Sequence, residues 1–228
     1  MSLIGSSSLR GEHALFSPSS PTWLNYTEEQ FLESLQNKYR ASIGTEIHEW
    51  AAIQIQLGLK CASVRDCAKS IKTMIFTKYY TEKYGISDFG KTLLENLKYI
   101  PSGVYNTVKM YVNESVACFM VPEEILDYSA NFFGTCDGLY FDHKKNLLRI
   151  FDLKTGVRAA KIEQLFAYEA LFCLKNKVDP FDISSDLRIY QNEEVVAASP
   201  APEDIRKIMD TIIRFDSLMN KYNRGGAL

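Results

Sequence analysis

Acidic residues on two predicted strands are the feature of this sequence best able to do chemistry. The apolar runs 134–141 and 147–153 are joined by a polar turn, which predicts a β-hairpin. Asp137 lies in the first run, and the second leads into Asp152-Leu153-Lys154. Because side chains alternate along a strand, Asp152 and Lys154 should point to one side, and pairing can bring Asp137 close to Asp152. Two carboxylates beside an ammonium group make a candidate site for a hard divalent cation.

The chemistry of such a site would be hydrolysis at a phosphate. Magnesium binds oxygen ligands and keeps several waters, so one or two carboxylates suffice when a phosphate supplies the rest. The ammonium group of Lys154 can polarise an attacking water or offset charge on the phosphate. The alternative is an ordinary strand charge or an exposed ion pair of little energetic value. The apolar neighbours Ile150, Phe151 and Leu153 favour the functional interpretation, because charges are seldom placed among such residues without a partner.

Three motifs follow one another in a fixed order. They are Gly134-Thr-Cys-Asp137, Asp152-Leu-Lys154-Thr and Gln164-Leu-Phe-Ala-Tyr168. The ordered set resembles the PD-(D/E)xK nucleases, and more specifically the RecB-like branch that includes phage recombination exonucleases. The resemblance implies that Asp137, Asp152 and Lys154 are catalytic, and that Asp137, Asp152 and the backbone carbonyl of Leu153 hold Mg²⁺ or Mn²⁺. It further implies that Gln164 and Tyr168 contact nucleic acid, with Arg158 and Lys161 on the same approach to the phosphates.

Two further residues are candidates for the same site. Gly44-Thr-Glu-Ile-His48 matches a Gly-x-x-x-His motif found early in RecB-like nucleases, where the resemblance makes the histidine a metal ligand. The alternative for His48 is a hydrogen-bonded histidine on a helix face. Glu114 precedes the first acidic strand, as a glutamate often does in that branch, and is a second candidate ligand. Its alternative is a surface charge on a strand.

Composition limits the other classes of function. The chain has 228 residues and a net charge of −2, so nucleic acid would have to be held by a local basic patch or through metal ions. Five cysteines without a CxxC pair give no zinc spacing, and no iron–sulfur cluster is expected. No apolar run is long enough for a transmembrane helix, and Met1–Gly11 is Ser-rich without the apolar core of a signal peptide. These first eleven residues are either native or derived from a vector.

The elements predicted around the hairpin define the expected fold. We expect helices at 27–40 and 45–56 with a break at 42–44, further helices at 64–80, 87–99, 158–174 and 202–221, and loops at 122–128 and 193–202. Strands are expected at 104–120, 132–141, 147–154 and 186–191. The fold class is therefore α/β, with a small central mixed sheet flanked by helices, a restriction-endonuclease-like core and an N-terminal helical extension. Residues 1–26 form an extended segment, 27–222 a single nuclease domain, and 223–228 a tail.

Together these observations predict a metal-dependent DNA nuclease, more an exonuclease acting on DNA ends in recombination or repair than an endonuclease. One alternative is a catalytically silent module that binds DNA ends or a recombinase. The other is a structure-specific or single-strand endonuclease of the same fold. DNA is the expected partner, and the resemblance adds a single-strand annealing protein and homo-oligomeric assembly. The expected location is the cytoplasm, which is that of the host if the gene belongs to a phage or prophage.

Overall fold

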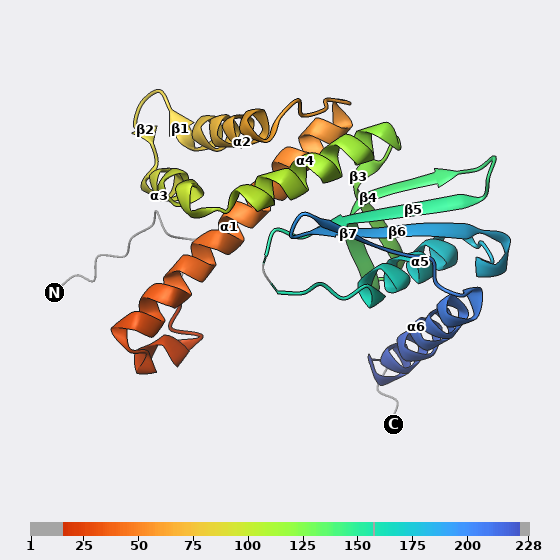
Figure 1. Cartoon of the computed structure of the whole chain (residues 1–228). Helices are drawn as coiled ribbons and strands as arrows, with labels where there is room; N and C mark the ends of the chain where they lie inside the picture. Colours follow the sequence, from red (N-terminus) through yellow and green to blue (C-terminus); the bar gives the residue numbers. More distant parts are fainter. Residues whose placement is uncertain (1–15, 157, 224–228) are drawn as a thin grey trace.

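The computed structural model describes residues 16–156 and 158–223, which form a five-stranded mixed sheet between two layers of helices (Figure 1). The strands lie in the order β3-β4-β5-β6-β7. β5 and β6 are parallel, and the other neighbours are antiparallel. The strand bounds are β3 Val121–Ser129, β4 Phe132–Asp142, β5 Leu147–Leu153, β6 Ser184–Gln191 and β7 Glu194–Ala198. The α/β class and the predicted hairpin, now β4 and β5, are confirmed.

Helices of the N-terminal half cover one face of the sheet, and helices of the C-terminal half cover the other (Figure 1). The bounds are α1 Glu28–Gln56, α2 Val64–Tyr79, α3 Asp88–Asn96, α4 Ser102–Ala117, α5 Glu163–Asn176 and α6 Pro202–Asn223. Short elements complete the chain: η2 Pro21–Asn25, β1 Tyr80–Thr81, β2 Gly85–Ile86, η3 Leu97–Tyr99 and η4 Pro180–Asp182. Thr27 caps α1 in a capping box with Gln30, as the sequence predicts.

Alternation along β5 divides its side chains between two cores. Phe151 and Leu153 pack into the core beneath α1, α2 and α4, whereas Leu148 and Ile150 pack into the core beneath α5 and α6. All four side chains are fully buried. The central strand is therefore fixed from both sides, which holds the residues at its end in a constant position.

Two predicted elements are wrong in type. Residues 104–120 were expected to form a strand, but 102–117 form the helix α4, which buries Tyr105, Val108, Tyr111 and Val112 at helical spacing. Residues 122–128 were expected to form a loop, but they lie in the edge strand β3. Pro122 is tolerated there because the edge of a sheet leaves some backbone N–H groups without a ladder partner. β3 therefore takes the place in the sheet that was expected for residues 104–120.

Three boundaries also differ from the expectation. α1 continues through residues 42–44, because Gly44 is buried where a Cβ would lie 2.9 Å from Oγ1 of Thr155. The helix expected to open at 158 begins only at Glu163. The loop expected at 193–202 contains the short strand β7. Within the described part of the chain, none of the helices combines the length and apolar character that crossing a membrane requires.

Candidate active site

The candidate site lies beneath α1, where the end of β5 meets the middle of β4 and the start of β3. Asp137 comes from β4 and Asp152 from β5, while Lys154 follows β5 directly and His48 comes from the middle of α1. The structure brings these four predicted residues together. Oδ2 of Asp137 lies 3.4 Å from Nδ1 of His48 and accepts a 2.8 Å hydrogen bond from the backbone N–H of Leu153. This bond ties the carboxylate of β4 to the end of β5. We call His48, Asp137, Asp152 and Lys154 the acidic cluster.

Asp152 and Lys154 lie on one side of the chain, as strand alternation predicts. Nζ of Lys154 donates a 3.0 Å hydrogen bond to Oδ1 of Asp152 and lies 2.8 Å from Oδ2. The second oxygen is buried and has no hydrogen-bond partner of suitable geometry. Burial, followed by the nearby charge of Asp137, raises the pKa of Asp152 to about 6, against the opposing effects of Lys154 and His48.

The carboxylates of Asp137 and Asp152 both act electrostatically on the imidazole of His48. Burial disfavours the charged imidazolium, but the hydrogen bond and charge of Asp137, with the charge of Asp152, outweigh it and raise the pKa of His48. The side chains of His48, Lys154 and Asp137 remain 28%, 29% and 19% exposed, whereas Asp152 is 4% exposed. The cluster is therefore open to a ligand on one side and closed beneath.

Glu123 is a further acid at the rim of this cluster. The β3–β4 ladder pairs Pro122 with Gly138 and Glu124 with Cys136, so Glu123 and Asp137 face each other between those pairs. Glu123 is exposed, yet partial desolvation and the charge of Asp137 raise its pKa, with His48 opposing. Its backbone has a φ of 54°, in the left-handed region, which is uncommon for a residue with a side chain. Sequence reasoning missed Glu123, although an acid inside an apolar run after Pro122 was the available signal.

Glu114 lies elsewhere, in a second network on α4. Its carboxylate pairs with the guanidinium of Arg188 and accepts a 2.7 Å hydrogen bond from the hydroxyl of Tyr190, both on β6. Arg188 also donates to Asp186, and its guanidinium lies over the ring of Phe151. Glu114 thus joins α4 to the sheet, and its role as a metal ligand remains a prediction.

The residues predicted to contact nucleic acid fall into two groups. Gln164 and Tyr168 both lie on α5, and the hydroxyl of Tyr168 donates a 2.6 Å hydrogen bond to the carbonyl of Thr135. A Cβ at Gly134 would lie 2.9 Å from the Tyr168 ring. Tyr168 therefore fixes α5 against β4 two residues from Asp137.

Arg158 and Lys161 are exposed in the segment that follows Lys154. The buried Gln191 of β6, which sequence reasoning also missed, holds this segment. Its side-chain amide donates 2.7 Å hydrogen bonds to the carbonyls of Gly156 and Arg158 and accepts one from the N–H of Ala160.

A third network holds α1 in place beside the cluster. The ammonium group of Lys78 on α2 contacts Glu46 at 3.0 Å and Glu49 at 2.5 Å, and the hydroxyl of Tyr79 donates to Glu46 at 2.8 Å. Glu46 and Glu49 flank His48 in the sequence. Their contacts lock the turn of α1 that presents the imidazole.

The donor set of the cluster suits a magnesium or manganese ion. It offers two carboxylates and one imidazole, and the buried Oδ2 of Asp152 lies 2.8 Å from the ammonium nitrogen of Lys154. Among residues 16–156 and 158–223, no three or more His, Cys, Asp and Glu side chains are arranged so that they alone could hold a metal ion. A cation would therefore need further ligands from water or substrate, which is the usual situation for Mg²⁺.

The chain was compared with known proteins, and no family model, curated protein or solved structure matches it.

Proposed function

We propose that this chain is a metal-dependent DNA nuclease that hydrolyses phosphodiester bonds, acting as an exonuclease on DNA ends. The observation that carries the proposal is the convergence of Asp137, Asp152 and Lys154 where the end of β5 lies beside the middle of β4, with His48 3.4 Å from Asp137. Placing two carboxylates, an ammonium group and an imidazole together in a half-buried position costs free energy and is therefore unusual. This set of groups suits phosphoryl chemistry.

In this proposal each residue has a distinct role. Asp137, Asp152 and the carbonyl of Leu153 hold Mg²⁺ or Mn²⁺, with His48 as an additional ligand. The bound cation would polarise the phosphate and activate water. Lys154 keeps its proton at Nζ and orients the attacking water or donates to a phosphate oxygen. The N–H of Leu153 holds Asp137 in orientation. Arg158 and Lys161 contact the phosphates of the approaching strand.

We propose further that the core is restriction-endonuclease-like and belongs to the RecB-like branch of the PD-(D/E)xK nucleases. The mixed sheet, the acidic hairpin β4–β5 and the helix α5 that follows it support this assignment. The close approach of Gly44 to Thr155 adds support, because it joins two of the predicted motifs in space.

The experiment compares cleavage of 5′- and 3′-end-labelled linear duplex and closed circular DNA, with Mg²⁺ or Mn²⁺. Asp137→Asn and Lys154→Ala should each lower cleavage by at least ~100-fold, while oligonucleotide binding measured by fluorescence anisotropy persists. Asp127→Asn, which removes an exposed acid of β3 paired with Lys175, is the matched control and should cleave normally. Full activity in either purified cluster variant would refute the assignment. Cleavage of circular DNA would replace the exonuclease with an endonuclease.

A further inference from the structure

The face of α2 that points away from the core carries three cations and two aromatic rings in one line. Positions 65, 69, 72, 76 and 80 are spaced by three or four residues, so they fall within about 80° of the helix circumference. The buried residues Cys67, Ile71 and Ile75 lie on the opposite side, where α2 packs on α1, α3 and α4. All five side chains of the line are exposed. We call Arg65, Lys69, Lys72, Phe76 and Tyr80 the α2 stripe.

The charge on the α2 stripe is of one sign. Over residues 64–80, all of which the structure describes, the only acid is Asp66. It lies about 100° around the helix from Arg65, and it accepts a 2.7 Å hydrogen bond from the hydroxyl of Ser63. Within the described part of the chain the three cations of the stripe form no salt bridge, whereas Lys78, on the side of α2 that meets α1, is paired twice.

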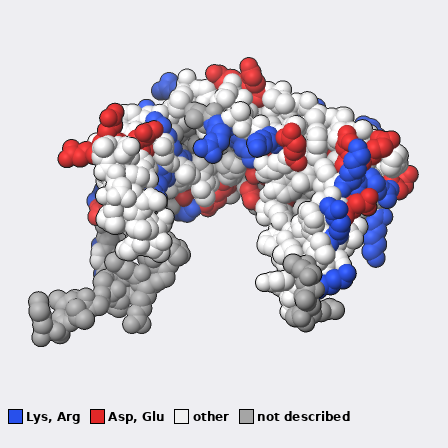
Figure 2. Space-filling view, turned by 90° about the horizontal axis from the view of Figure 1, so that it is seen from below, with Lys and Arg blue, Asp and Glu red and all other residues white. Residues whose placement is uncertain are grey.

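The surroundings of the stripe do not cancel this charge. Residues 60–86 contain six lysines and arginines against two acids, Asp66 and Glu82, although the whole chain has a net charge of −2. The acids in residues 43–56 of α1, in α3 and in α4 are Glu46 and Glu49, paired with Lys78, Asp88, paired with Lys91, Glu114, paired with Arg188, and the exposed Glu95. On the face turned away from α2, basic and acidic side chains instead lie next to one another at the right (Figure 2).

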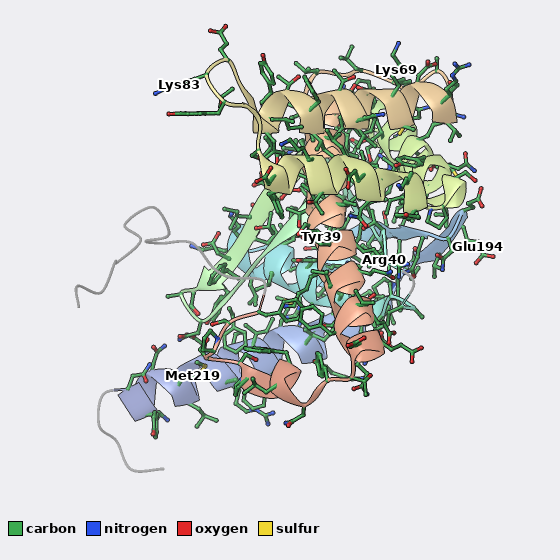
Figure 3. The ribbon with its side chains drawn as sticks, turned by 90° about the vertical axis from the view of Figure 1, so that its left-hand side faces the viewer. Tyr39, Arg40, Lys69, Lys83, Glu194 and Met219 are labelled. Carbon is green, nitrogen blue, oxygen red and sulfur yellow. The ribbon has the colours of Figure 1, made fainter. Side chains whose placement is uncertain are left out.

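The two aromatic rings are what an ordinary solvated helix face does not explain. Phe76 is 46% exposed in the stripe, and its ring stacks on that of Tyr80 with centroids 5.4 Å apart and an interplanar angle of 19°. In the β1–β2 turn beyond, Tyr84 is 77% exposed and Nζ of Lys83 lies 4.9 Å from its ring centroid. Figure 3 labels Lys83 on this turn and Lys69 on α2. A helix face opposite the core is normally polar, so the exposed rings point to a ligand.

The ligand that suits rings and cations in one line is a single strand of nucleic acid. Its unpaired bases can stack on aromatic faces while its phosphates pair with lysine and arginine, and such stacking tolerates any sequence. In a duplex the bases are already stacked and paired, so their faces cannot reach a helix surface. A lipid surface would require a broad aliphatic face, and the stripe has no leucine, isoleucine or valine.

We propose that the α2 stripe binds single-stranded nucleic acid, with bases stacked on its two rings and phosphates paired with its three cations. This inference rests on the proposed nuclease function and deepens it, because it assigns a second contact that holds an unpaired tail of the substrate. The stripe ends beside the turn of α1 that carries His48, since Lys78 and Tyr79 both bond to Glu46. It uses no residue of the acidic cluster.

The test is binding of a fluorescein-labelled oligothymidylate of ~15 nucleotides to the full chain, measured by fluorescence anisotropy in EDTA so that no metal-dependent cleavage occurs. Phe76→Ala should weaken binding by at least ~5-fold, the lower bound for the loss of one base–aromatic stack. Phe76→Tyr keeps the ring and should bind like wild type. Replacing Lys69 and Lys72 together by glutamine should lower the steepness of log K against log salt by roughly 1.4, because each phosphate contact of a single strand contributes ~0.7.

The matched controls lie on the other side of the sheet. Phe181→Ala removes a ring that is 56% exposed and lies beneath the guanidinium of Arg206. Replacing Lys207 and Lys221 together by glutamine removes two exposed cations of α6. Both controls should bind the oligonucleotide like wild type and keep its salt dependence. Circular dichroism checks that every variant is folded, which the exposure of the substituted side chains favours.

Four results would overturn the inference. They are no saturable binding by wild type up to ~100 µM at low salt, unchanged binding by Phe76→Ala, an equal loss of salt dependence in the α6 control, and tighter binding of a blunt duplex than of the single strand. The inference and the nuclease proposal fail separately. Binding in EDTA does not depend on cleavage, and the loss of cleavage expected for Asp137→Asn does not depend on the stripe.

Discussion

Replacing Glu169 by glutamine should make the protein more stable at neutral and alkaline pH. Glu169 lies on the face of α5 that packs on the sheet, is 3% exposed, and has one carboxylate oxygen without a hydrogen-bond partner. Burial raises its pKa to about 7, with a hydrogen bond to Ser185 acting in the opposite direction. The native state therefore keeps this carboxyl protonated to a higher pH than the unfolded chain does.

The magnitude follows from linkage. Raising this pKa from its ordinary value of 4.5 to about 7 corresponds to ~3 kcal/mol, at ~1.4 kcal/mol for each pKa unit. Because the folded pKa is raised, the stability is fully present below pH 4.5 and is lost as the pH rises through about 7. Above that range the ionised carboxylate lowers the free energy of unfolding by an amount that no longer changes with pH. Glutamine has no charge to desolvate, so the Glu169→Gln variant should not show this loss.

The assay is urea unfolding between pH 5 and pH 8.5, followed by the fluorescence of Trp50, which is buried in the core. The difference in unfolding free energy between Glu169→Gln and wild type should grow by ~3 kcal/mol across this range. Contributions from Asp152 and His48 cancel in the difference. Glu163→Gln, an exposed change on the same helix, should track wild type. A difference that stays flat with pH would refute the reasoning that burial controls this carboxyl.

Three further contacts can each be tested by substitution. Gly44→Ala should lower stability by roughly 1–3 kcal/mol, because its Cβ would lie 2.9 Å from Oγ1 of Thr155. In a double-mutant cycle, the same change made in a Thr155→Ala background should instead raise stability by roughly 0.5–1 kcal/mol. Tyr168→Phe removes the 2.6 Å hydrogen bond to Thr135 and should cost ~1 kcal/mol by urea unfolding, whereas an unchanged midpoint would show that the bond contributes nothing. Glu114→Gln should lower the melting temperature by disrupting the Arg188 network while Mn²⁺ affinity stays the same, and a loss of affinity would instead make Glu114 a ligand.

The hairpin and the site on it could be predicted from sequence because their determinants are local. The runs around Asp137 and Asp152 are apolar segments of strand length, and a turn joins them. Once that pairing is assumed, the relation of Asp152 to Lys154 follows from the geometry of a strand. His48 required the resemblance as well, because no local pattern says which face of α1 meets the sheet.

The rest depended on tertiary contacts. Residues 104–120 contain valines at 104, 108, 112 and 116, a spacing of four that suits a helix, but their β-branched and aromatic character also favours a strand. Packing of this segment against β5 and β6 stabilises the helix over a strand. Pro122 and the acidic residues after it favoured a loop prediction, but the edge position of β3 tolerates them. Because this segment was expected to be a loop, Glu123 was not recognised as a site residue. Gly44 lies inside α1, where its missing Cβ permits the close approach of Thr155, so it does not mark a helix end.

The most direct measurement is Mn²⁺ binding by electron paramagnetic resonance, which counts free ion without needing any activity. We expect saturable binding by wild type, a loss of at least ~10-fold in affinity for both Asp137→Asn and Asp152→Asn, and unchanged binding for Asp127→Asn. Binding that survives in both cluster variants, or that is absent from wild type in the presence of oligonucleotide, would contradict a cation shared by Asp137 of β4 and Asp152 of β5.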